Sequence, residues 1–171
     1  FNGFVAGRAT TAEGATHAFR WSATTGMIDL GETSYGEPSA VSSTGQVAGR
    51  WDFDGLTAGF TWTPETGTVA LPFAGSPNSS VGSINASGQM TGNAYTEGFA
   101  EYHTLAWTLG GAVTDLGESG QAIGVSDNHL IVVNDDNQAL VWSIPGFASD
   151  NTAAAITITS PIDGGTIAQN A

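Results

Sequence analysis

Residues 45–62 read GQVAGRWDFDGLTAGFTW, and this stretch holds the two strand patterns from which the fold can be predicted. It opens on Gly-x-Val-x-Gly at 45–49 and closes on Phe60-Thr61-Trp62. The two aromatic residues of the closing element stand two apart, which places both on one face of a strand. A turn follows, and Leu71 comes nine residues after the tryptophan.

The same pattern recurs along the chain, so the protein is built from repeats. The repeat tryptophans Trp21, Trp62, Trp107 and Trp142 are spaced 41, 45 and 35 residues apart. Such a period is typical of repeats that form four short strands, as in a propeller blade. We therefore predict an all-β fold, a β-propeller of about four four-stranded blades or an arc of a larger propeller. The predicted repeats cover residues 1–31, 39–72, 81–117 and 122–151.

The two ends of the repeat domain depart from this pattern. The first repeat lacks its opening strand, and the position nine residues after Trp142 is Asn151 instead of leucine. Residues 152–171 are predicted either to supply a closing strand at 153–159 or to link the domain, over 1–151, to a following Ig-like module. All four repeat tryptophans are predicted to lie in the core.

Composition narrows the classes of partner. The chain has 171 residues, no cysteine, three arginines, no lysine and a net charge of -13. Disulfides and thiol chemistry are excluded, and so acidic a chain repels nucleic acid and anionic membranes. No apolar run is long enough for membrane insertion. We predict a secreted protein, extracellular or at the cell surface.

The repeat elements also resemble a known family. His17-Ala18-Phe19-Arg20-Trp21, with its downstream leucine and the Gly-Gln-Val-x-Gly strand, resembles the HAF-type extracellular repeats of secreted bacterial proteins, over roughly residues 1–143. The resemblance implies export, tandem β-blades and no established activity. The histidine is replaced by Ala58 and Gln138 in two copies. His17 and His103, which keep it, are interpreted as structural.

Candidate binding residues lie where the repeats differ most, in loops expected to share one rim of the propeller. Exposed aromatic rings beside carboxylates suit a glycan or an extracellular protein as ligand. The residues predicted to bind it are Trp51, Phe53, Tyr95, Glu97, Phe99, Glu101 and Tyr102. The closely spaced carboxylates predicted as candidates for Ca²⁺ are Asp52, Asp54, Asp135 and Asp136.

No motif identifies a reaction. The chain contains no Gly-x-Ser-x-Gly, His-Glu-x-x-His or Gly-x-Gly-x-x-Gly sequence. We therefore predict a non-catalytic extracellular binding module that uses the variable loop rim and needs no cofactor besides the candidate Ca²⁺. The alternative is a structural repeat unit that self-associates into a cell-surface assembly or fibre through open blade edges.

Overall fold

The computed structural model of the chain describes residues 3–32, 37–53, 56–71, 78–95, 102–117, 120–135, 138–143 and 156–159. These residues form antiparallel sheets of three or four strands and include no helix. It follows that no described segment is a helix able to cross a membrane. The predicted all-β class is confirmed.

Four sheets follow one another along the chain, and within each sheet the strands lie in sequence order. Sheet 1 contains β1 (Phe4–Thr10), β2 (Thr16–Ser22) and β3 (Gly26–Glu32). Sheet 2 contains β4 (Glu37–Val41), β5 (Val47–Phe53), β6 (Leu56–Thr63) and β7 (Gly67–Ala70). Sheet 3 contains β8 (Asn78–Ile84), β9 (Met90–Tyr95), β10 (Tyr102–Trp107) and β11 (Val113–Asp115). Sheet 4 contains β12 (Gln121–Val125), β13 (Leu130–Asp135), β14 (Gln138–Ser143) and β15 (Ile156–Thr159).

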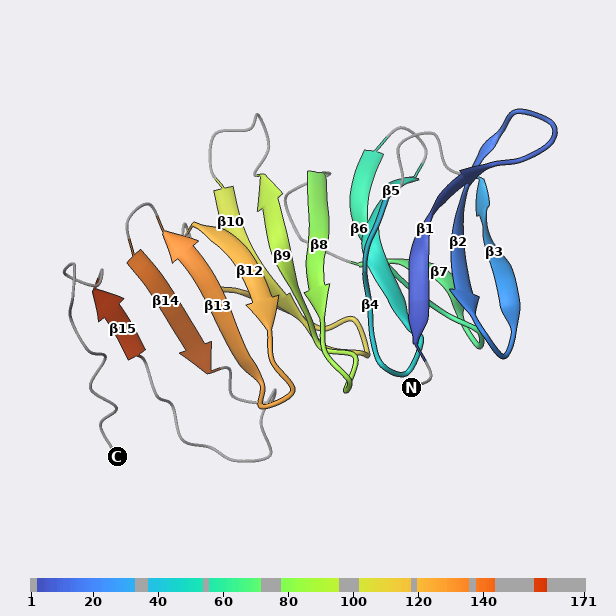
Figure 1. The fold of residues 1–171 in the computed structure, drawn as a ribbon. Helices are drawn as coiled ribbons and strands as arrows, with labels where there is room; N and C mark the ends of the chain where they lie inside the picture. Colours follow the sequence, from blue (N-terminus) through green and yellow to red (C-terminus); the bar gives the residue numbers. More distant parts are fainter. Residues whose placement is uncertain are drawn as a thin grey trace.

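The sheets are arranged as an open row. In Figure 1 each sheet lies beside the next, with sheet 1 at one end of the row and sheet 4 at the other. Each sheet has two edges, and none closes on itself. Among the described residues sheet 1 has three strands where the others have four, and it holds no counterpart of β4, β8 and β12.

The tail strand β15 completes the last sheet instead of joining the first. It pairs with β14, and Ile158 lies opposite Ala139, three residues before Trp142. At the same position in the inner repeats, Leu71 and Leu116 donate their backbone N–H groups to Gly59 and Thr104. Ile158 therefore takes the register position of the repeat leucine, from a segment farther along the chain.

The face that carries the repeat tryptophan packs onto the preceding sheet. Trp62, with Val47 and Phe60 on the same face of sheet 2, packs against Ala18 and Leu30 of sheet 1.

Sheet 3 repeats the arrangement, since Trp107 and Leu105 pack against Ala48 and Leu71 of sheet 2. Trp62 is 6% exposed and Trp107 is 0% exposed. The predicted burial of these two tryptophans is confirmed, and each interface is built from one tryptophan-bearing face and one face of smaller residues.

The tryptophans of the two end sheets are not core residues, contrary to the prediction. Trp21 is 40% exposed and Trp142 is 37% exposed. Trp21 lies on the face of sheet 1 that points away from sheet 2, where no described sheet covers it. Trp142 lies on the face of sheet 4 that packs onto sheet 3 through Ile131 and Val133, yet it keeps this exposure. A repeat position thus determines which face a tryptophan occupies but not whether it is buried.

The histidines of the HAF motif join two strands of their own sheet. His17 Nδ1 lies 2.9 and 2.8 Å from the carboxylate oxygens of Asp29, which also accepts the Gly31 backbone N–H. This backbone hydrogen bond, followed by the one from His17, lowers the pKa of Asp29 below its ordinary value.

Sheet 3 has the same arrangement, because His103 Nδ1 lies 3.0 and 2.9 Å from the oxygens of Asp115 and Gly117 donates to that carboxylate. In sheet 2 alanines, Ala58 and Ala70, occupy both positions. The histidine and the aspartate thus occur together or not at all, as expected of a structural pair.

Candidate functional site

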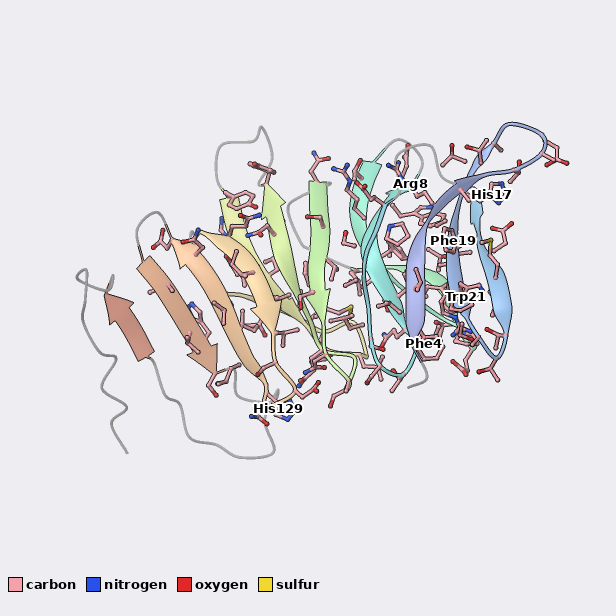
Figure 2. All side chains as sticks on the ribbon, in the orientation of Figure 1. Phe4, Arg8, His17, Phe19, Trp21 and His129 are labelled. Carbon is pink, nitrogen blue, oxygen red and sulfur yellow. The ribbon has the colours of Figure 1, made fainter. Side chains whose placement is uncertain are left out.

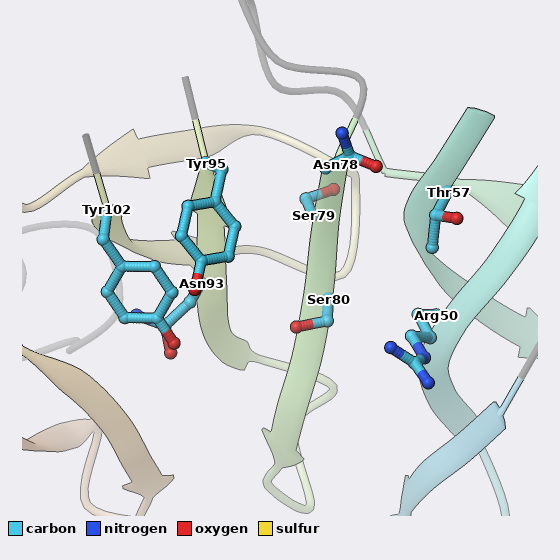
Figure 3. A pocket seen from close by; sticks show the side chains of 8 residues that line it. All are labelled: Arg50, Thr57, Asn78, Ser79, Ser80, Asn93, Tyr95 and Tyr102. Carbon is cyan, nitrogen blue, oxygen red and sulfur yellow. The ribbon is translucent and has the colours of Figure 1, made fainter. Parts of the chain in front are cut away.

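A polar pocket opens where the ends of sheets 2 and 3 meet. It has a volume of about 260 Å³ and is shown in Figure 3. Its lining comes from two strands of sheet 2 and three strands of sheet 3. The lining residues are Arg50, Thr57, Asn78, Ser79, Ser80, Asn93, Tyr95 and Tyr102.

Two tyrosines form one wall of the pocket. Tyr95 ends β9 and Tyr102 begins β10, and the two residues are cross-strand partners. Cross-strand neighbours project from the same face, so their rings pack together with centroids 4.7 Å apart at an interplanar angle of 54°. Tyr95 is 41% exposed and offers ring surface to a ligand. Burial, and secondarily the neighbouring Tyr95, raises the pKa of Tyr102, which stays a neutral hydrogen-bonding phenol at ordinary pH.

Two further lining residues hold the sheets together at this point. Ser79 Oγ accepts the backbone N–H of Gly59 at 2.8 Å and so ties β8 to β6. Asn93 Oδ1 accepts the backbone N–H of Ala122 at 3.0 Å, while its Nδ2 donates to the Gly120 carbonyl at 3.2 Å. Both side chains are buried. Since their polar atoms are used between sheets, these residues fix the shape of the pocket.

The opposite wall comes from sheet 2. Thr57 and Arg50 lie across the pocket from the tyrosines in Figure 3. Arg50 Nη2 is 3.3 Å from Glu37 Oε2, and Arg8 Nη2 is 3.5 Å from the other oxygen of the same carboxylate. All three side chains are about half exposed. Ion pairs at such positions are weak, so the guanidinium of Arg50 is available to a ligand at the pocket mouth.

The lining groups combine an aromatic surface with neutral hydrogen-bonding groups and one cation. The amide of Asn78 and the hydroxyl group of Ser80 lie on the strand between Tyr95 and Thr57, and all of these groups line the pocket. The Arg50 charge is offset by Glu37. A ligand that fits this chemistry is uncharged, rich in hydroxyl groups and has an apolar face.

Of the residues predicted to bind a ligand, the structure brings Tyr95 and Tyr102 into one pocket. Phe53 is the last residue of β5. The other rim residues of the prediction, Glu97, Phe99 and Glu101, lie outside the described residues.

Trp51 is not an exposed rim residue, and that expectation is wrong. Its side chain is 8% exposed and packs edge-on against Phe60, with ring centroids 5.1 Å apart at 71°. The physical reason is that β5 continues to Phe53, so Trp51 lies on the same face as Val47 and points toward sheet 1. Its ring lies beside Gly31, where a Cβ would stand at an ordinary contact distance of 3.7 Å from the indole.

The carboxylates predicted to bind calcium are only partly described. Asp52 lies within β5 and Asp135 ends β13, whereas Asp54 and Asp136 lie outside the described residues. Among the residues the structure describes, no group of three or more histidine or acidic side chains is placed to hold a metal ion. Calcium binding stays a prediction, which a rise of the melting temperature on adding Ca²⁺ at fixed ionic strength would test.

Six lining residues were missed by sequence reasoning: Arg50, Thr57, Asn78, Ser79, Ser80 and Asn93. Asn78-Ser79-Ser80 forms the start of β8, whereas the sequence placed this strand only from residue 81 onward. The polar run just before Val81 was the available signal, because a strand that starts at the rim presents its first side chains there.

The chain matches no protein-family model, and no curated protein is significantly similar to it in sequence.

Proposed function

We propose that this protein is a non-catalytic extracellular binding module, a β-propeller or an arc of one, that holds a neutral glycan in the rim pocket. One observation carries the proposal. The partly exposed Tyr95 ring, supported from behind by Tyr102, stands beside neutral polar side chains in a pocket of about 260 Å³.

The pocket groups divide the recognition of a sugar between them. The C–H face of a pyranose ring stacks on Tyr95, and such a contact contributes on the order of 1 kcal/mol beyond simple burial. The sugar hydroxyl groups accept hydrogen bonds from Arg50, and they can donate to or accept from the hydroxyl group of Ser80. The backing by Tyr102 fixes the Tyr95 ring in advance, which reduces the entropy lost on binding.

The size of the pocket favours a glycan over a protein as the ligand. Small-molecule sites usually have volumes of roughly 300 to 1,000 Å³. The volume here, about 260 Å³, lies just below that range and suits one or two sugar rings. An extracellular location is supported by the net charge of -13 and by the resemblance to HAF-type repeats.

A glycan array probed with the full chain tests the proposal, followed by titration of the best ligand. We expect Tyr95→Ala to weaken binding by about fivefold or more, since 1 kcal/mol corresponds to that factor. Tyr95→Phe keeps the ring and should keep most of the affinity. Leu109→Ala, at an exposed position outside the pocket, is the matched control. Binding of no glycan, or equal binding by Tyr95→Ala at an unchanged melting temperature, would contradict the proposal.

Self-association into a larger structural assembly is the second candidate function, and a separate observation favours it. β1 is an edge strand of a three-stranded sheet, at the position where the other sheets carry a fourth strand. An unpaired strand edge can pair with a strand of another chain. Light scattering of the full chain tests this function, and a single-chain mass at high protein concentration would contradict it.

A further inference from the structure

The outer face of sheet 1 is apolar, and no described segment covers it. Val5, Trp21 and Met27 are cross-strand neighbours on β1, β2 and β3, and therefore share one face. Val5 and Met27 are more than half exposed. Beside them, Phe19 and Met27 line a hollow of about 300 Å³. Figure 2 shows Phe19 and Trp21 on the sheet at the end of the row.

The repeats show what this face is built to contact. Val47 and Trp62 in sheet 2 have the register relation that Val5 and Trp21 have in sheet 1. Met90 and Trp107 repeat it in sheet 3. Both inner pairs are buried by the preceding sheet. The Val5 and Trp21 face is thus one half of an interface that occurs inside the chain.

A face that can serve as the other half of that interface lies at the opposite end of the row, where no described segment covers it. Val132 lies on the face of β13 opposite to the buried Ile131 and Val133, and it is 38% exposed. Its cross-strand partner is Val141.

The inner repeats assign a role to this pair of valines. Ala48 and Thr61 hold the same register positions in sheet 2, on the face that covers Trp107 of sheet 3. Val132 and Val141 therefore lie where a receiving face for a tryptophan-bearing sheet is expected.

We propose that the outer face of sheet 1 docks onto the outer face of sheet 4 of a second copy of this chain. The inference rests on the self-association function, and it replaces pairing at the β1 edge by stacking of sheet faces. The partner is argued from continuity: the contact extends, between copies, the stacking that already joins successive sheets within one chain. Because the two faces differ, the contact is head-to-tail, and it closes as a two-copy ring or continues as a longer array.

Net charge sets how the contact responds to salt. Each copy carries a net charge of -13, so two copies repel one another at low ionic strength. Salt screens this repulsion, with a Debye length of about 10 Å at 0.1 M and about 3 Å at 1 M. Burial of Val5, Trp21 and Met27 is not weakened by screening. Association therefore becomes stronger as NaCl is added, the reverse of an assembly held by ion pairs.

Sedimentation of the full chain at low salt and at about 0.5 M NaCl tests the proposal, together with two charge-introducing variants. Trp21→Asp changes the first face and Val132→Asp the second, and each should weaken association by at least about tenfold. Met27→Asp, at a more exposed position, repeats the first test if Trp21→Asp lowers the melting temperature. Mixed in equal amounts, the two variants should associate again, because one supplies an intact sheet 4 and the other an intact sheet 1.

Three results would overturn the proposal. Full association by Val132→Asp alone would mean that two sheet 1 faces meet symmetrically. Full association by both variants would mean that the copies pair through the β1 edge. The self-association function would then be retained, and the proposed sheet-face interface would be rejected. A wild-type chain that stays a single copy at high concentration and high salt would remove both the interface and the self-association function.

Discussion

Inner and end sheets carry the same repeat tryptophan in different surroundings. In sheets 2 and 3, Trp62 and Trp107 are covered by the preceding sheet, whereas Trp21 and Trp142 in sheets 1 and 4 are partly exposed. The cross-strand register around all four residues is the same. Equal sequence positions therefore give equal local geometry, while burial and its contribution to stability differ from one sheet to the next.

The largest expected effect separates an inner tryptophan from an end tryptophan. Trp107→Ala removes a fully buried indole and should lower the free energy of unfolding by about 3 to 5 kcal/mol. Trp21→Ala removes a partly solvated side chain and should cost about 1 kcal/mol. Urea unfolding followed by circular dichroism measures both values. Equal losses at a protein concentration where the chain is a single copy would mean that Trp21 is covered within its own chain.

Trp51 extends the comparison to a position that has no counterpart of its size. The equivalent residues are Ala9 in sheet 1 and Ala94 in sheet 3, so the indole is specific to sheet 2. Because it is buried against Phe60, Trp51→Ala should destabilise by about 3 kcal/mol. The same urea titration checks this value. A loss of only about 1 kcal/mol, as expected for Trp21→Ala, would mean that Trp51 is exposed at the rim.

Much of the fold was predictable from the sequence, because repetition constrains it. Spacing of two between Phe60 and Trp62 predicted their shared face, and three aligned copies predicted the strand order. A closing strand at 153–159 was one of the two predictions for the tail, but its pairing with β14 was not predicted, since residues 156–159 follow Trp142 at a distance that no other repeat uses. The ring predicted from the repeat period also depends on the angle between successive sheets, which no single repeat determines.

The candidate site was only half predictable, for a related reason. Tyr95 and Tyr102 stand out as large residues at a variable loop, and the structure places them together. Trp51 was predicted to lie in a loop, because the strand pattern was taken to end at Gly49, whereas β5 continues to Phe53. Arg50 and Asn78 lie far apart in the sequence and meet only because sheets 2 and 3 stack. Residues that belong to a site between repeats have no signature within one repeat.

The smallest expected effect concerns the hairpin turn of the last sheet. Gly45 and Gly88 hold φ angles of 85° and 76° in the inner sheets, and His129 holds 64° in sheet 4. A side chain in this left-handed region costs roughly 1 to 2 kcal/mol, although His129 recovers part of it through its hydrogen bond with Gln89. His129→Gly and His129→Ala both remove the imidazole, so their difference isolates the backbone. We expect the free energy of unfolding, measured in urea, to be about 1 kcal/mol higher for the glycine variant than for the alanine variant. Equal stability of the two variants would show that the last turn relaxes to accommodate a side chain at this position.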